Sequence, residues 1–162
     1  MIDYPKYKKV LFCTDFSKNC ELVFDYAFGI AKRDEAMLYI LHVIPTIPDQ
    51  YHSEIHSFFQ KDNIYEINKS LETSCIEKYE NEYLRNIKDK EKVKFIIRHG
   101  REEDEILKFA EEEGVDIIVI GIHGETGVRH AILGSVAERI IRQSSVPVFI
   151  ISSKTLQKLN LT

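Results

Sequence analysis

Two pairs of small residues in the second half of the chain have the spacing of an anion-binding element. Gly121 and Gly124 follow a strongly apolar run, and nine residues separate Gly124 from Gly134 and Ser135. Glycines let backbone N–H groups approach a ligand closely, and a helix that begins at Ser135 would add its positive dipole end. The spacing therefore predicts a phosphate-binding element.

This element differs from a P-loop, because the chain has no G-x-x-x-x-G-K-[ST] pattern and no lysine is placed to neutralise a phosphate. Phosphate charge must instead be neutralised by backbone N–H groups, the helix dipole and a divalent cation. Arg129 and His130 lie inside the element and could assist. His123 has a pKa range suited to proton transfer, but no carboxylate is paired with it. We therefore interpret His123 as a positioning residue.

Strands and helices alternate along the chain that carries this element. Short apolar runs predict buried strands over 8–14, 37–44, 93–98, 115–121 and 146–151. Helical spacing predicts one helix after a cap at Ser17 and a second over 101–113, which has acidic residues in its first turn. A further helix is predicted over 135–143. This order implies an α/β fold with right-handed crossovers: a single-domain, open, doubly wound, five-stranded parallel sheet with helices on both faces, Rossmann-like.

Such sheets bind ligands beyond the carboxyl ends of their strands. The glycine element follows the fourth strand, and the first strand ends in the polar run Thr14 to Ser17, which includes Asp15. If the first and fourth strands are neighbours, these two segments face one crevice.

Simpler explanations exist for each of these residues. Ser135 with Glu138 matches the S-x-x-E capping box, and Asp15 could be only a turn or cap residue. Gly121 and Gly124 could serve only to turn the chain. Because a cap and a ligand contact are compatible, these alternatives stay open.

The crossover over 45–92 is longer than the fold needs and begins with two prolines. Residues 46–60 are predicted to form a loop, either a lid or a partner contact, in which His52 and His56 face solvent rather than a metal. An apolar stripe then predicts one long amphipathic helix that packs on the core: Ile64, Ile67, Leu71, Cys75, Tyr79 and Tyr83.

The composition limits the class of protein. The 162 residues, 44% of them hydrophobic, suffice for one core. A net charge of −4 with interspersed signs favours neither nucleic acid nor an anionic membrane surface, and no apolar run approaches the roughly 20 residues that span a bilayer. Cys13, Cys20 and Cys75 form no C-x-x-C, which fits a reducing compartment. We expect a cytoplasmic protein with no nucleic-acid and no membrane partner.

The order of these motifs resembles the universal stress protein family over nearly the whole chain. The resemblance rests on Thr14 to Ser17, on the G-x-x-G-x9-G-[ST] element within 119–138, and on 146–148 in the last strand. The complete glycine element is similar to that of the family's ATP-binding branch. The family's fold is the five-stranded doubly wound sheet expected above.

The resemblance implies that the chain binds ATP, with Mg²⁺ or Mn²⁺. Asp15 and backbone groups near Val43 would contact the adenine end, and the glycines with Ser135 would surround the ribose and phosphates. The predicted nucleotide-binding residues are Thr14, Asp15, Val43, Gly121, His123, Gly124, Arg129, Gly134 and Ser135. No catalytic residue is assigned, and the metal ligands are unknown.

The leading hypothesis is an ATP-binding stress-response protein that uses nucleotide occupancy to bias its contacts with unidentified protein partners, with slow hydrolysis or none. The alternative is a homodimeric adaptor with a vestigial nucleotide site. Both predict a homodimer, because the strand Val146 to Ile151 is an apolar edge strand and family members dimerise through it. An adenylating enzyme is disfavoured, because Thr14 to Ser17 lacks the glycine- and serine-rich or histidine-rich signature of that group.

Overall fold

The computed structural model describes residues 6–46, 61–87, 90–122, 133–152 and 155. Its strands are β1 (Lys9–Cys13), β2 (Met37–Pro45), β3 (Val93–Gly100), β4 (Ile117–Gly121) and β5 (Val148–Ile151). Its helices are α1 (Cys20–Asp34), α3 (Lys61–Lys78), α4 (Glu102–Glu113) and α5 (Ser135–Gln143), with a π-helical turn at Tyr79–Tyr83 and a 3-10 turn at Leu84–Asn86.

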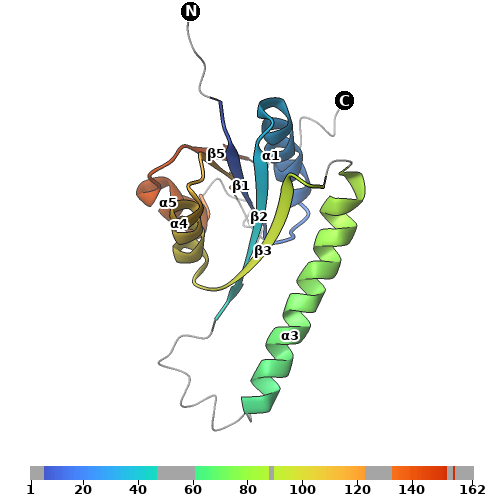
Figure 1. Ribbon diagram of the computed structural model, residues 1–162. Coiled ribbons are helices and arrows are strands. Elements are labelled where there is room, and N and C mark those ends of the chain that lie inside the picture. The colour runs from blue at the N-terminus through green and yellow to red at the C-terminus, as the bar shows by residue number, and fades with distance from the viewer. Residues whose placement is uncertain (1–5, 47–60, 88–89, 123–132, 153–154, 156–162) are drawn as a thin grey trace, which may run out of the picture.

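The strands form one parallel sheet in the order β3-β2-β1-β4-β5. Helices α1 and α3 lie on one face of the sheet, and α4 and α5 lie on the other (Figure 1). The predicted α/β fold is therefore confirmed. The first strand pairs with the fourth, which is the condition stated above for the two segments to face one crevice. This pairing brings the segment after β1 and the segment after β4 to the same end of the sheet.

Alternate side chains of β1 enter two separate cores. Val10 and Phe12 pack in the core on the α1 side, whereas Leu11 and Cys13 pack in the core on the α4 and α5 side. Because both faces of a central parallel strand are covered, its sequence is a continuous apolar run rather than an alternating one. The strand ends are thereby fixed firmly enough to position a site.

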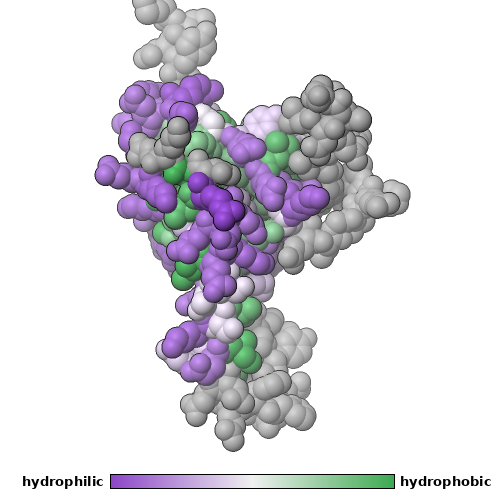
Figure 2. Space-filling view, turned by 90° about the vertical axis from the view of Figure 1, so that its right-hand side faces the viewer, coloured by the Kyte–Doolittle hydropathy of each residue, from purple (hydrophilic) through white to green (hydrophobic). Residues whose placement is uncertain are grey.

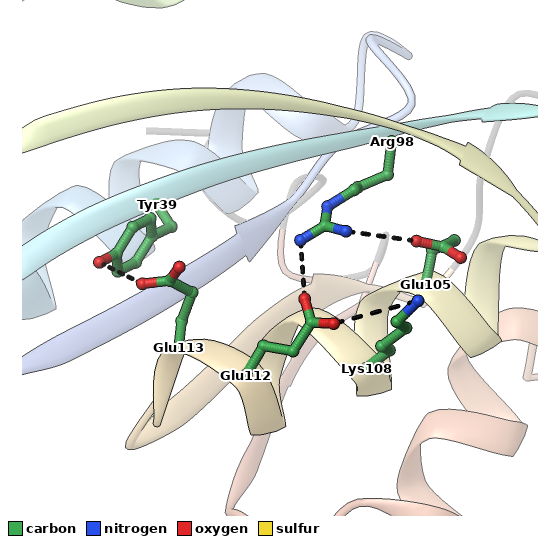
Figure 3. A network of polar contacts seen from close by, with 6 residues as sticks. All are labelled: Tyr39, Arg98, Glu105, Lys108, Glu112 and Glu113. Carbon is green, nitrogen blue, oxygen red and sulfur yellow. Dashed lines mark hydrogen bonds and ion pairs between the residues drawn. The ribbon is translucent and has the colours of Figure 1, made fainter.

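Helix α4 is fastened to the neighbouring strands by polar contacts along its second half. Arg98 of β3 forms an ion pair with Glu112 at 2.8 Å, and the Tyr39 hydroxyl of β2 donates a hydrogen bond to Glu113 at 3.0 Å (Figure 3). These contacts hold the helix against β2 and β3. Its first turn, which begins at Glu102, is consequently held near the carboxyl ends of the strands.

The long helix of the crossover is confirmed as α3, but its apolar stripe is only partly buried. Cys75 and Tyr83 are buried, whereas Ile67 is 50% exposed and Leu71 is 44% exposed. The prediction of core packing is wrong for Ile67 and Leu71. The first half of α3, which includes Ile67, projects beyond the carboxyl ends of the strands (Figure 1). Apolar side chains are visible on this projecting part in the lower region of Figure 2.

The last strand begins later than predicted. It starts at Val148 rather than Val146, because Pro147 has no N–H group to donate to the ladder. The carbonyl oxygen of Pro147 still accepts a hydrogen bond from the backbone N–H of Ile118 at 3.0 Å. The strand remains at the edge of the sheet, as predicted, with β4 as its neighbour.

Apart from Thr46, the predicted loop over 46–60 lies outside the described residues, and so do His52 and His56. Within the described ranges, none of the helices combines the length and the apolar character needed to cross a bilayer.

Candidate functional site

A cavity of about 380 Å³ lies at the carboxyl ends of β1, β2 and β4. This volume is within the range of small-molecule sites, and the position is the one where open α/β sheets bind ligands. The first turns of α1, α4 and α5 complete its wall. The lining residues are Cys13, Thr14, Asp15, Cys20, Leu41, His42, Val43, Glu102, Ile106, Ile120, Gly121, Ile122, Gly134, Ser135, Val136 and Ala137.

Most of the site residues predicted from the sequence line this cavity. Six predicted site residues line it: Thr14, Asp15, Val43, Gly121, Gly134 and Ser135. The other three, His123, Gly124 and Arg129, lie outside the described residues, as does His130. The convergence of the two predicted segments is confirmed, and the role of each residue toward a ligand stays a prediction.

Thr14 and Asp15 are fixed by hydrogen bonds within the loop that follows β1. The Thr14 hydroxyl oxygen accepts a hydrogen bond from the N–H of Phe16 at 3.0 Å and is hydrogen-bonded to the buried Tyr83 hydroxyl at 2.7 Å. The Asp15 carboxylate accepts a hydrogen bond from the N–H of Ser17 at 2.9 Å, which makes a side-chain turn. The turn role considered for Asp15 is therefore present, together with its place on the cavity wall.

The predicted helix cap at Ser17 is wrong. Helix α1 begins at Cys20 with Asn19 as the N-cap residue, because the turn around Asp15 delays the helix start. The Cys20 thiol donates a hydrogen bond to the Asp15 carboxylate at 3.0 Å. Burial, followed by the charge of Asp15, raises the pKa of Cys20 to about 11, so the thiol stays protonated and keeps donating at neutral pH.

His42 connects this loop to β2, and the sequence prediction omitted it. Its Nδ1 donates a hydrogen bond to the carbonyl oxygen of Thr14 at 2.8 Å, which places the proton on Nδ1. Its ring lies 4.9 Å from the Phe16 ring, centroid to centroid. The sequence feature that could have identified His42 is its position beside Val43, near the carboxyl end of a predicted buried strand.

The opposite part of the wall consists mainly of backbone. The N–H of Gly134 donates a hydrogen bond to the carbonyl oxygen of Ile122 at 3.1 Å. The N–H of Ile122 donates one to the carbonyl oxygen of Ile151 at 3.0 Å. A Cβ atom added at Gly134 would lie 3.0 Å from the Ile122 oxygen, which is tighter than ordinary packing. Glycine at this position lets the segment before α5 lie directly against the end of β4.

The capping box considered for Ser135 does not form in the described structure. Gly134 is the N-cap residue of α5, and no described side chain caps this helix. Glu138 instead forms an ion pair with Arg142, four residues on, at 3.0 Å. Ser135 is the first residue of α5 and lines the cavity, where the free N–H groups of a helix start attract negative charge.

Helix α4 contributes a carboxylate that the sequence prediction also omitted. Glu102 lines the cavity, and burial raises the pKa of its carboxyl group, with smaller effects from the charges of Glu103 and Asp15. Its neighbour Glu103 is buried and forms ion pairs with Arg101 and Arg139. The acidic run at the helix start was visible in the sequence, but we interpreted it only as a match to the helix dipole.

The described lining therefore has an uneven charge distribution. Asp15 and Glu102 supply carboxylates, His42 supplies an imidazole, and none of the described lining residues is a lysine or arginine. The described parts of the chain also hold no cluster of three or more metal-ligating side chains. Hydrogen-bond donors suit the carboxylate region, and an anion suits the region of backbone N–H groups at the start of α5.

Comparison with known proteins gives a consistent match. The model of the universal stress protein family matches residues 6–152. Universal stress protein MJ0577 of Methanocaldococcus jannaschii is 36% identical over 163 aligned residues, which cover 91% of this chain and 96% of that protein. The solved structure of MJ0577 matches with a TM-score of 0.70 at 30% identity, covering 91% of this chain and 97% of the other.

Two nucleotide complexes share the fold at lower identity. A universal stress protein in complex with cAMP matches with a TM-score of 0.59 at 23% identity, over 91% of this chain and 98% of that one. The universal stress protein from Archaeoglobus fulgidus in complex with dAMP matches with a TM-score of 0.53 at 23% identity, over 91% and 99% of the two chains.

Proposed function

This chain belongs to the universal stress protein family, and from this premise we propose that its cavity binds an adenine nucleotide, with ATP as the expected ligand. The observation that carries the proposal is the meeting of two distant segments at one cavity. The Thr14 and Asp15 turn and the Gly134 and Ser135 helix start both line a space of about 380 Å³. Neither segment alone would define a nucleotide site.

The uneven lining suggests an orientation for the nucleotide. The adenine lies toward Asp15 and the backbone of Val43, and the phosphates lie toward Gly134 and Ser135 at the positive end of α5. Gly121 also lines the cavity, and the proposed site further includes His123, Gly124 and Arg129. Proteins of the same fold hold cAMP and dAMP, which supports an adenine nucleotide as the ligand class.

A divalent cation, Mg²⁺ or Mn²⁺, is expected to accompany the phosphates. Such hard cations bind oxygen, keep several water ligands and need only one or two protein carboxylates in addition to phosphate oxygens. Asp15 and Glu102, the carboxylates on the described lining, are not assigned to the phosphate end, so the cation would be held mainly by phosphate oxygens and water. The cation would neutralise phosphate charge, which no lysine or arginine of the described lining can do.

Nucleotide occupancy, rather than rapid hydrolysis, is the proposed working principle. His42 already donates its Nδ1 proton to the Thr14 carbonyl, and the Cys20 thiol stays protonated at neutral pH. Both arrangements fix the loop after β1, and a thiol that stays protonated does not deprotonate water. A bound nucleotide would therefore persist and bias contacts with protein partners in the cytoplasm, where the free cysteines Cys13, Cys20 and Cys75 are compatible with a reducing environment.

A second proposal concerns assembly: the chain forms a homodimer through β5. This strand lies at the edge of the sheet, and edge strands present unpaired N–H and C=O groups. Phe149 on β5 is 39% exposed, and Ile141 on α5 is 43% exposed. An adaptor with a vestigial nucleotide site would form the same homodimer. Oligomeric mass alone therefore does not separate the adaptor from the nucleotide-binding protein.

Identification of any small molecule released on denaturation separates them. Freshly purified protein is denatured, and the supernatant is analysed by mass spectrometry, with equal amounts of protein before and after extensive dialysis. We expect an adenine nucleotide in the undialysed sample, near one per chain. Release of a ligand from another chemical class would contradict the proposal, and protein that neither carries nor rebinds ATP would support the adaptor.

A further inference from the structure

We propose that Glu102 recognises the ribose of the bound nucleotide by accepting a hydrogen bond from its 2′-hydroxyl. The inference rests on the proposed nucleotide-binding function. It goes beyond that function by assigning the sugar specificity of the site to a residue outside the glycine element and outside the loop after β1.

Glu102 lies at the cavity wall on a helix that is fixed to the sheet. Glu102 is the first residue of α4, is only partly exposed and lines the cavity. The helix is held in place by the ion pair of Arg98 with Glu112 and by the hydrogen bond of Tyr39 with Glu113 (Figure 3). A helix fixed in this way holds the backbone of Glu102 at the cavity wall, so its carboxylate is available to a ligand in the cavity.

Glu102 differs from the neighbouring acids Glu103 and Glu105 near the start of α4. Glu103 forms ion pairs with Arg101 and Arg139, and Glu105 lies 4.0 Å from Arg98. Among the residues that the structure describes, none donates a hydrogen bond or forms an ion pair with the Glu102 carboxylate. An ionised carboxylate is an acceptor only, so it is satisfied by a ligand that brings a donor into the cavity.

The phosphates and the adenine of the nucleotide do not suit a position beside Glu102. A phosphate beside Glu102 and Asp15 would place like charges together in a partly desolvated space. The adenine amino group is assigned to Asp15 under the proposed orientation. The ribose hydroxyls are the remaining donors, and a carboxylate on the ribose 2′-hydroxyl is established chemistry in other nucleotide-binding α/β folds.

The environment of this contact strengthens it. Ile106 and Ile120 line the cavity as apolar residues, and so do Val136 and Ala137 at the start of α5. A hydrogen bond in such surroundings is electrostatically stronger than one in water. Burial also raises the pKa of Glu102, which indicates that the carboxylate is partly desolvated before any ligand binds.

The test is a calorimetric comparison of Mg-ATP with Mg-2′-deoxy-ATP on the full chain. We expect the wild-type protein to bind ATP about tenfold more tightly, as a lost hydrogen bond to a charged group predicts. Glu102→Ala should bind the two ligands equally, and Glu102→Gln, which keeps the side-chain volume, should show a reduced preference. Asp104→Asn, an exposed charge change one residue beyond Glu103 and off the cavity lining, should keep the wild-type ratio.

Two results would overturn the inference. If wild-type protein binds ATP and 2′-deoxy-ATP equally, or if both Glu102 variants keep the wild-type preference, Glu102 does not read the ribose although nucleotide binding stands. If folded wild-type protein binds neither ligand, the proposed nucleotide-binding function fails as well. Far-ultraviolet circular dichroism on every variant establishes that each is folded.

Discussion

The two sides of the cavity are built differently. The carboxylate side consists of Asp15 and Glu102 with the imidazole of His42, whereas the glycine side consists of Gly134 and Ser135 at the start of α5. One side offers charged acceptors and the other offers backbone N–H groups. For a ligand with a neutral, donor-rich end and an anionic end, this difference selects a single orientation.

The two sides are also held in place by different means. On the carboxylate side, side-chain hydrogen bonds fix the loop after β1. Asp15 accepts one from the Ser17 N–H, and Thr14 forms one with Tyr83. The glycine side depends on close backbone contact, as in the 3.1 Å hydrogen bond from Gly134 to Ile122. Added bulk should therefore damage the glycine side, and removal of a charge or hydroxyl should damage the carboxylate side.

The largest effect is expected from Gly134→Val on the glycine side. Its Cβ would lie 3.0 Å from the Ile122 oxygen, and the two methyl groups would crowd the start of α5 further. We expect ATP affinity, measured by calorimetry, to fall about a hundredfold, which corresponds to an overpacking cost near the upper end of the range of about 1–3 kcal/mol. Gly29→Val is the matched control, because a Cβ at Gly29 meets nothing within 4 Å.

Unchanged ATP affinity in Gly134→Val would contradict the glycine side as the phosphate region. Loss of the folded state, seen by circular dichroism, would instead assign Gly134 to the turn alone. Gly29→Val should stay folded and bind ATP like the wild type.

Asp15→Asn tests the carboxylate side by removing one charge while keeping an oxygen that can accept from the Ser17 N–H. We expect about a tenfold loss of ATP affinity, since a hydrogen bond to a charged group is worth about 1.5 kcal/mol at the lower end of its range. Asp116→Asn is the control, because Asp116 also accepts backbone hydrogen bonds, from Lys8 and Lys9, at the amino end of the sheet. Equal losses in both variants would mean that the effect is structural.

Tyr83→Phe sharpens the comparison by weakening only the support of the carboxylate side. It removes the buried hydrogen bond to the Thr14 hydroxyl, which keeps its bond from the Phe16 N–H. We expect the free energy of unfolding to fall by about 1 kcal/mol in urea titrations, with a smaller change in ATP affinity. Tyr65→Phe should change neither, because Tyr65 is 66% exposed. A stability equal to wild type in Tyr83→Phe would show that this bond contributes nothing.

The smallest effect concerns the pH dependence of stability through Glu102. Its pKa is raised in the folded state, chiefly by burial, so the folded chain binds a proton more tightly than the unfolded chain does. This contribution is fully present below the unfolded pKa, which lies near 4.3, and is lost as pH rises through the folded pKa. Glu102→Gln should therefore gain stability relative to wild type across this window. A constant difference in unfolding free energy between the two proteins, measured from pH 4 to pH 7, would contradict the shift.

The fold and the two main segments of the site were predictable from local patterns. Continuous apolar runs predicted the buried parallel strands, because both faces of such a sheet are covered. The polar residues Thr14 and Asp15 after one strand and Gly134 after another were then brought together by the pairing of β1 with β4. Strand order, rather than any single motif, made this part of the site visible.

The remaining features depended on tertiary contacts or on backbone geometry. The prediction of a cap at Ser17 was wrong because Phe16 adopts a left-handed backbone conformation with φ of 58°. The residue type of Phe16 does not indicate this conformation. Glu102 was omitted because its approach to the cavity depends on how α4 docks on β2 and β3. The exposure of Ile67 depends on how far α3 extends past the sheet, and an apolar stripe alone does not give that length.

The central claim is that this cavity holds an adenine nucleotide, and calorimetric titration of the full chain with Mg-ATP and Mg-GTP tests it most directly. We predict binding of ATP at one site per chain, at or below millimolar concentration. GTP should bind more weakly, because guanine presents a carbonyl oxygen where adenine presents the amino group assigned to Asp15. Folded protein that binds no ATP at millimolar concentration, or that binds GTP as tightly as ATP, would contradict this account.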